Sequence, residues 1–183
     1  MAHDGMMAGD EPATDAPPQG NHFDGIAYLK RFSRLIERGR TVLDAGCGDG
    51  LPVDAYLIKH GLAVNGIDAS ARLVARARKN VPEGFYEIKD LYELTEGEYC
   101  VDGVVSLRAL LQIPYEHYRA LLTTFASFMP TGGALLLRMS ADEPGQAGAG
   151  DTTEFLEDAG FAIILKEVGG RGDNTHQLVL ARS

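Results

Sequence analysis

The sequence predicts an α/β fold of the doubly wound type, with a mainly parallel sheet whose last strand runs antiparallel. From residue 41 onward, short apolar stretches typical of strands alternate with longer amphipathic stretches typical of helices. This order is that of βαβ units, which build parallel sheets covered by helices on both faces. The last two strand-like stretches are instead joined by a glycine-rich turn at residues 169–174, and a hairpin reverses strand direction.

The 183 residues fit one domain of moderate size. Residues 1–20 are rich in Gly, Pro, Asp, Ala and Met without periodicity, so we expect a disordered tail there and a single domain over residues 21–183. The first element of that domain is expected to be a helix over residues 22–38. Its apolar residues Ile26, Leu29, Phe32 and Ile36 recur at helical spacing, and Gly39 can end it.

The remaining elements follow in order. Strands are predicted over residues 41–45, 63–68, 85–89, 101–106, 134–139, 161–168 and 177–181. Helices are predicted over residues 52–60, 70–80, 115–129 and 152–159.

The charge and the apolar content of the chain exclude some classes of binding partner. The formal charge of −9 and the lack of a dense Lys/Arg block argue against a nucleic acid partner. No apolar run approaches the roughly 20 residues that span a bilayer, and the N-terminus lacks a secretory pattern. The two cysteines, Cys47 and Cys100, show neither a disulfide nor a zinc pattern. We therefore expect a cytoplasmic protein with no membrane partner and with reduced thiols.

The most informative stretch is the turn that follows the first strand. The strand ends in Asp44, and Gly46, Gly48 and Gly50 follow at every second position. Glycine lets a ligand approach bare backbone and permits positive φ. A dinucleotide fingerprint would place its third glycine at Leu51, and no G-K-[ST] follows, so a triphosphate site is not expected. An acid at this position suits a ligand with a positively charged group.

A second acid, Asp68, ends the second strand 22 residues beyond Gly46. In doubly wound folds, an acid about 20 residues after the glycines hydrogen-bonds ribose hydroxyls. The alternative is that Asp68 caps the next helix, although Ser70 can serve that purpose.

The order D-x-G-x-G-x-G, with the spaced acid, resembles motif I of the class I S-adenosylmethionine-dependent methyltransferases. The alternative is a glycine-rich turn of another α/β protein. Further similarity at the ends of the third and fourth strands extends the resemblance over residues 41–181, about three quarters of the chain. It implies a Rossmann-like methyltransferase fold with a seven-stranded sheet, S-adenosylmethionine as methyl donor and S-adenosylhomocysteine as product.

The resemblance also implies roles for individual residues. Asp68 would hold the ribose, Ala69 and Leu91 would form the adenine slot, and Asp90 would accept from the adenine amino group, unless it makes only an Asx turn. Asp44 would support the loop and face the ammonium group through water, and carbonyls near Ser106 would also accept from this group. The residues expected at the cofactor are Asp44, Ala45, Gly46, Cys47, Gly48, Gly50, Asp68, Ala69, Asp90, Leu91 and Ser106.

The acceptor side is less defined. Gln112 stands where many relatives have a histidine, which removes the usual base. His117, at the start of a helix on the expected substrate side, is the candidate general base, although a solvated histidine is common there. The residues expected to touch the substrate are Tyr28, Arg108, Gln112 and Tyr115, although the tyrosines could simply pack and Arg108 could meet a nearby carboxylate.

The expected substrate is a small molecule. The motifs typical of nucleic acid amino-methylating enzymes, of protein arginine enzymes and of metal-dependent catechol enzymes are missing after the fourth strand, so no metal is expected. The helix at residues 22–38 and the loop at residues 142–150 are expected to close over bound substrate. Two alternatives stay open: a non-catalytic S-adenosylmethionine-binding module or partner-dependent subunit, and a nicotinamide-dependent oxidoreductase, which Leu51 disfavours. The sequence leaves the oligomeric state open.

Overall fold

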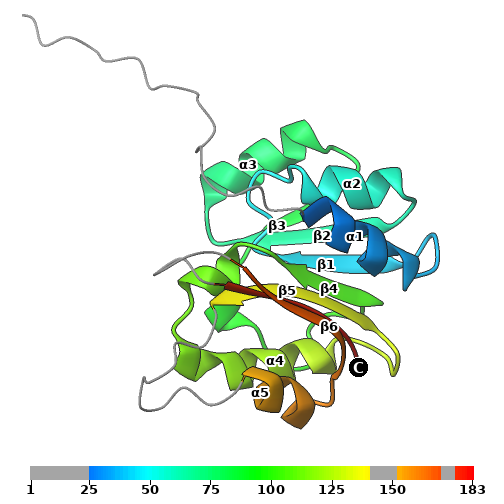
Figure 1. The fold of residues 1–183 in the computed structure, drawn as a ribbon. Helices are drawn as coiled ribbons and strands as arrows, with labels where there is room; N and C mark the ends of the chain where they lie inside the picture. Colours follow the sequence, from blue (N-terminus) through cyan, green and yellow to red (C-terminus); the bar gives the residue numbers. More distant parts are fainter. Residues whose placement is uncertain (1–24, 141–151, 170–175) are drawn as a thin grey trace, which may run out of the picture.

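The computed structural model describes residues 25–140, 152–169 and 176–183. In these residues, seven strands form one sheet in the order β3-β2-β1-β4-β5-β7-β6 (Figure 1). The strands are β1 Thr41–Ala45, β2 Ala63–Asp68, β3 Phe85–Ile88, β4 Gly103–Ser106, β5 Ala134–Ser140, β6 Ala162–Gly169 and β7 His176–Arg182. The helices are α1 Gly25–Arg34, α2 Val53–Lys59, α3 Ala71–Asn80, α4 Tyr118–Ser127 and α5 Thr152–Asp158, with 3₁₀ turns η1 Leu91–Glu93, η2 Ala109–Gln112 and η3 Tyr115–His117.

The predicted fold class is confirmed. Strands β1 to β5 pair in parallel, and β7 runs antiparallel to both of its neighbours, β5 and β6. Helices α1, α2 and α3 cover one face of the sheet, and α4 and α5 cover the other (Figure 1). Strand β1 lies between β2 and β4, so the strand order reverses there, and such a point is where doubly wound sheets bind ligands.

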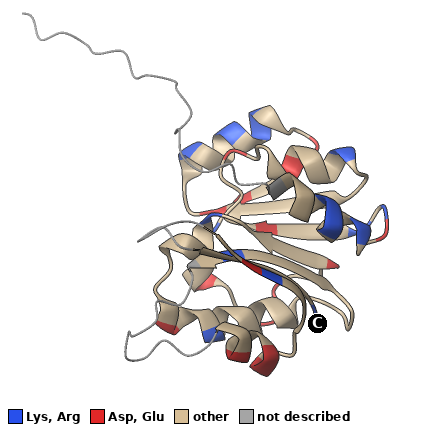
Figure 2. Cartoon of the chain, in the orientation of Figure 1, with Lys and Arg blue, Asp and Glu red and all other residues tan. Residues whose placement is uncertain are grey.

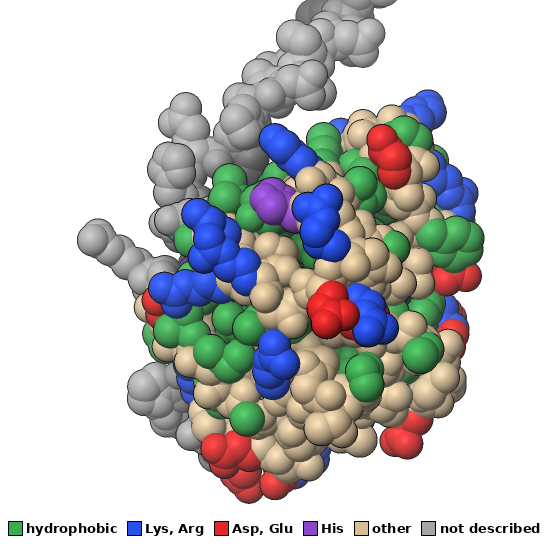
Figure 3. Space-filling view, turned by 90° about the vertical axis from the view of Figure 1, so that its right-hand side faces the viewer, with side chains coloured by type: hydrophobic (Ala, Val, Ile, Leu, Met, Phe, Trp, Pro, Cys, Tyr) green, Lys and Arg blue, Asp and Glu red, His purple; other side chains and the backbone are tan. Residues whose placement is uncertain are grey.

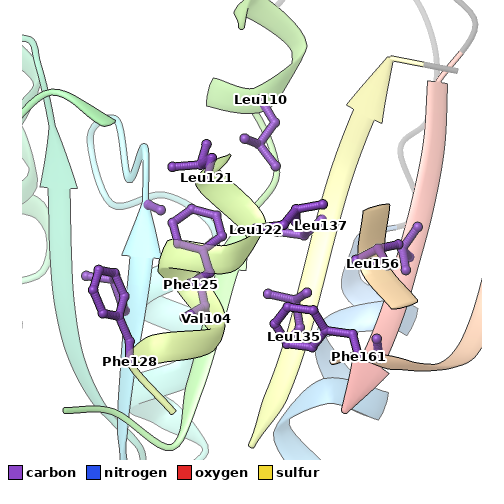
Figure 4. Packing of buried hydrophobic residues seen from close by; sticks show 14 of the residues in the cluster. Val104, Leu110, Leu121, Leu122, Phe125, Phe128, Leu135, Leu137, Leu156 and Phe161 are labelled. Atoms are coloured by element: carbon purple, nitrogen blue, oxygen red, sulfur yellow. The ribbon is translucent and has the colours of Figure 1, made fainter. Parts of the chain in front are cut away.

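Two large apolar clusters hold the layers together. On the α1 face, Leu29 and Phe32 pack with Leu57 of α2 against Val42 and Val105 of the sheet. On the α4 face, Leu122 and Phe125 lie over sheet residues such as Val104 and Leu135 (Figure 4). Because one continuous sheet contributes to both clusters, the order of β1, β2 and β4 is held from both sides.

Most differences from the predicted elements are at their ends. The helix expected at residues 22–38 is α-helical only to Arg34, and residues 22–24 lie outside the described residues. The helix expected from residue 115 begins as the turn η3 and becomes α-helical at Tyr118. The expected tail at residues 1–20, the loop at 142–150 and most of the hairpin turn also lie outside the described residues.

Figure 2 shows that charged residues of both signs are spread along the helices and at several strand ends, with others inside the sheet. In the view of Figure 3, lysines and arginines are separated by apolar and uncharged surface. Within the described ranges, no helix combines the length and the apolar character needed to cross a membrane.

Candidate functional site

A cavity of about 530 Å³ lies beyond the carboxyl ends of β1, β2, β3 and β4, within the size range of small-ligand sites. Its walls come from the loops that leave these four strands and from the first turn of α3. The lining residues are Gly46, Gly48, Asp68, Ala69, Ser70, Leu73, Lys89, Asp90, Leu91, Tyr92, Arg108, Ala109, Gln112 and Ile113.

The glycine loop after β1 is hydrogen-bonded to the neighbouring strand β2. Ala45 lies opposite Ile67 in the parallel register, so the chain leaves β1 and β2 at adjacent points. The N–H groups of Gly46 and Cys47 both donate to the Ile67 carbonyl, at 2.8 and 3.0 Å. Gly46 has a φ of +92°, and a Cβ atom there would lie 2.3 Å from the Ala109 Cβ. Only glycine therefore fits at position 46.

Asp68 connects this loop to α3 and also lines the cavity. Its Oδ2 accepts from the Gly48 N–H at 3.0 Å, and its Oδ1 accepts from the Ser70 N–H at 2.8 Å. A carboxylate has about four acceptor sites, so these two bonds leave capacity for hydroxyl donors. Ser70 is the residue that caps α3, accepting from the Leu73 N–H at 3.3 Å, and this frees Asp68 from that role.

Asp90 and Leu91 line the cavity at the end of β3, together with Ala69 beyond β2. The Oδ1 atom of Asp90 accepts from the Tyr92 N–H at 3.0 Å, which makes the Asx turn that opens η1. The Asx turn thus occurs, and it leaves the second carboxylate oxygen of Asp90 for another donor.

The other residues expected at the cofactor are not among those that line the cavity. Ala45, Cys47 and Ser106 are buried, and the Ser106 Oγ donates to the Ala45 carbonyl at 2.6 Å, which ties the ends of β1 and β4 together. A Cβ atom on Gly50 would point toward Val81, Asp54 and Tyr86, on the side of α3 and β3. These residues are buried on the side of the glycine loop that faces away from the cavity, and they support the loop there.

Asp44 is buried behind the loop with a second carboxyl group that sequence analysis did not single out. Asp44 is 3% exposed, and Asp54 of α2 is fully buried. Burial, and next the charge of Asp54, raise the pKa of Asp44 well above its usual value. Burial also raises the pKa of Asp54 to about 6. An acid in the first turn of a helix ordinarily faces solvent, so nothing in the local sequence signalled this pair.

Of the residues expected to touch the substrate, Arg108 and Gln112 line the cavity. Tyr28 does not: it is buried in the cluster on the α1 face, where desolvation and the nearby Glu167 raise its pKa. Tyr115 packs against Tyr118 and Phe155, with ring centroids 5.5 and 5.1 Å apart. Both rings thus take part in apolar packing, which is the alternative that the sequence left open, and their contact with a substrate stays a prediction.

His117 borders a second, smaller hollow of about 160 Å³. This hollow shares Leu91, Tyr92 and Ile113 with the main cavity, so the two adjoin. The His117 ring meets Tyr92 edge to face, with centroids 5.0 Å apart. The expected base thus lies next to the main cavity and not in its wall.

Several residues of the cavity wall were not predicted from the sequence, namely Ser70, Leu73, Lys89, Tyr92, Ala109 and Ile113. Most of them immediately follow or precede a residue that was predicted, so widening each strand-end motif by one or two positions would have found them. Lys89 is paired with Glu98 at 2.7 Å.

A seven-stranded sheet in this order, with a glycine loop after β1 and an acid at the end of β2, defines a Rossmann-like methyltransferase fold. A family model described as "Methyltransferase domain" matches residues 42–133. The chain belongs to this family, the class I S-adenosylmethionine-dependent methyltransferases.

Individual relatives agree with this assignment. An uncharacterized methyltransferase of Synechocystis sp. is 31% identical over 180 residues, covering 84% of each chain. Trans-aconitate 2-methyltransferase of Delftia acidovorans is 32% identical over 107 residues, covering 57% of this chain and 39% of that protein. The chain spans 39 to 50% of the length of the curated relatives it matches first. A crystal structure of magnesium protoporphyrin IX methyltransferase from Synechocystis with bound S-adenosylmethionine is 25% identical, with a TM-score of 0.69 and coverage of 87% of this chain and 76% of that one.

Proposed function

We propose that this protein binds S-adenosylmethionine in the main cavity and transfers its methyl group to a small-molecule acceptor, releasing S-adenosylhomocysteine. The observation that carries the proposal is the position of Asp68. It lies in the cavity wall, braced by two backbone N–H groups beside a loop that requires glycine. The methyltransferase names of the relatives support the same reaction.

The described residues fit this ligand. Asp68 has acceptor capacity for the two ribose hydroxyls, and Asp90 has a free oxygen for the adenine amino group. Ala69 and Leu91 offer apolar surface for the ring. The loop at Gly46 and Gly48 brings bare backbone to the cavity, where a side chain at position 46 would collide with Ala109. We assign these residues to contact with the cofactor. The residues that support the loop from its buried side are Asp44, Ala45, Cys47, Gly50 and Ser106.

When bound, S-adenosylmethionine supplies a methyl group activated by a sulfonium charge. The protein's part in such a displacement is to hold the acceptor in line and to exclude water. Arg108, Gln112 and Ile113 form the wall beyond β4 and are the residues we assign to that task. His117 is proposed as the proton acceptor for an acceptor molecule that extends past Tyr92 into the second hollow.

Calorimetric titration with S-adenosylmethionine, S-adenosylhomocysteine and NAD tests the cofactor. We expect binding of the first two and none of NAD, and the opposite result would favour an oxidoreductase. Acceptors are then screened by release of S-adenosylhomocysteine. Binding of the cofactor without turnover on any small molecule would favour the non-catalytic module.

We also propose that the protein acts in the cytoplasm and without nucleic acid. Cys47 and Cys100 are both free thiols, as is usual in a reducing compartment, and the net charge of −9 opposes binding to a phosphate backbone. Cell fractionation and a DNA and RNA gel-shift assay at low salt test the two statements.

A further inference from the structure

Arg108 lies over the glycine loop. It follows β4, and its side chain reaches back toward the loop after β1. Its Nη2 donates to the Leu51 carbonyl at 3.3 Å. Its Nη1 lies 3.6 Å from the position that a Cβ atom on Gly48 would take. These contacts hold the guanidinium at the β1–β4 end of the cavity.

This guanidinium has hydrogen-bonding capacity to spare. A guanidinium carries five N–H donors, and the bond to Leu51 uses one of them. Within residues 25–140, 152–169 and 176–183, Arg108 makes no ion pair, whereas Lys89, the other cation of the cavity wall, is paired with Glu98. In the described cavity wall, Arg108 is therefore the cation with no carboxylate at ion-pair distance, and the buried carboxyl of Asp44 interacts with its charge from farther away.

The strand order places this charge at a definite part of the proposed ligand. Asp90 and Leu91, assigned to adenine, follow β3, and Asp68, assigned to the ribose, ends β2. In the order β3-β2-β1-β4, the next part of the ligand falls on the loop after β1 and the segment after β4. That part of S-adenosylmethionine is its aminoacyl chain, which ends in an ammonium group and a carboxylate.

We propose that Arg108 binds the α-carboxylate of the aminoacyl chain, an inference that rests on the proposed function. The planar guanidinium fork matches a carboxylate in a two-point hydrogen bond. An acidic acceptor is the other possible source of a carboxylate at this place. The role proposed here is thus one of cofactor recognition, in place of the substrate contact that the sequence suggested for Arg108.

The test compares two ligands on two variants by calorimetry. S-adenosylhomocysteine carries the carboxylate, and its decarboxylated analogue lacks only that group. Arg108→Gln should weaken S-adenosylhomocysteine by about 10- to 100-fold, the usual effect of a charged hydrogen bond, and leave the analogue within about twofold. Lys89→Gln, which removes the other cation of the cavity, should leave the ratio of the two affinities unchanged.

Each other outcome has a distinct meaning. Equal weakening of both ligands by Arg108→Gln would overturn the proposal and assign Arg108 to support of the loop through Leu51. No weakening of either ligand would also overturn it and leave the guanidinium to the acceptor. If the unaltered protein bound neither ligand, the proposed function itself would fail. Thermal unfolding of each variant confirms that it is folded, as expected because Arg108 is exposed and Lys89 is only half-buried.

Discussion

Asp68 links the loop after β1 to the start of α3, and it is the residue on which the proposed cofactor site most depends. Replacing it with alanine removes the acceptor for the Gly48 and Ser70 N–H groups as well as the proposed acceptor for the ribose. We expect Asp68→Ala to weaken S-adenosylhomocysteine by at least about 10- to 100-fold in calorimetry. Asp49→Ala is the control, since Asp49 pairs with Arg76 and does not line the cavity. Equal affinities for the two variants would contradict the ribose assignment.

The carboxyl pair behind the loop predicts a pH-dependent stability. The pKa of Asp54 is raised to about 6 in the folded protein, so folding favours its protonated form. Its contribution is fully present below about pH 4 and is lost as the pH rises through about 6. Asp54→Asn removes this ionisation, so its gain in the free energy of unfolding should be small near pH 4 and reach about 1–3 kcal/mol at pH 8.

Urea denaturation at several pH values between 4 and 8 measures this gain. The control is Asp158→Asn, which removes an exposed carboxylate that pairs with Arg119 far from the loop. It should change the free energy of unfolding by less than about 1 kcal/mol. If Asp54→Asn lowered the free energy of unfolding by the same amount at every pH, the ionisation of Asp54 would not affect stability, and its side chain would contribute through packing alone.

At the scale of elements, the turn between β1 and α2 depends far more on glycine at position 46 than on glycine at position 48. A Cβ atom at Gly46, with φ of +92°, would collide with Ala109 of η2. We expect Gly46→Ala to lower the free energy of unfolding by about 2–5 kcal/mol, from backbone strain and overpacking together. Gly48→Ala is the matched control. Its φ of +59° lies in the left-handed region, and its Cβ would make an ordinary 3.6 Å contact, so the expected loss is about 1 kcal/mol.

Urea denaturation at one pH compares the two alanine variants, and Gly46→Ala combined with Ala109→Gly should recover part of the loss. If the two single variants were equally stable, the collision with Ala109 would not govern the turn, and the requirement for glycine would be a matter of φ alone.

The strands around the site were predictable because each is a short apolar run that ends at a polar residue or a glycine. β1 and β2 have the predicted bounds, residues 41–45 and 63–68. β4 begins two residues later than expected, at Gly103, because the N–H groups of the two preceding residues bond to the carbonyls of Phe128 and Thr41. The apolar residues at helical spacing include Leu29, Phe32 and Ile36, which are buried, but also Ile26, which is exposed, and the spacing did not indicate that α1 ends at Arg34.

In the candidate site, too, residues at strand ends were predictable, and residues on helices were less so. Residues that directly follow a strand, such as Asp68, Asp90 and Arg108, reach the cavity because the sheet brings its strand ends together. Residues on helices were harder to place, since their direction depends on tertiary packing. Asp54 faces inward for reasons that lie in other segments of the chain, and no local pattern reports it. Tyr28 shares the helical spacing of Phe32 and Ile36, which indicates packing on the same buried face.

For the whole molecule, one sheet joins the cavity to the antiparallel strands that do not touch it. The cavity is built at the β3-β2-β1-β4 side, and β5, β7 and β6 continue the same sheet. The clusters on both faces contain residues from β1, β4, β5 and β7 alike. We therefore expect the described part of the chain to unfold as one cooperative unit, so that a ligand bound at one side stabilises all of it.

Calorimetric scanning with and without S-adenosylhomocysteine tests this coupling. A ligand that binds only the folded state, at 100 times its Kd, adds about 2.7 kcal/mol to the free energy of unfolding. For a chain of this length, that corresponds to a rise of about 5–11 °C in Tm. We expect a single transition that moves as a whole. Asp68→Ala, which weakens the ligand by about 10- to 100-fold, should gain only about 0.4–1.4 kcal/mol at the same ligand concentration and therefore show a clearly smaller shift. Two transitions, of which only one moves with ligand, would show that the β6–β7 side unfolds independently of the site.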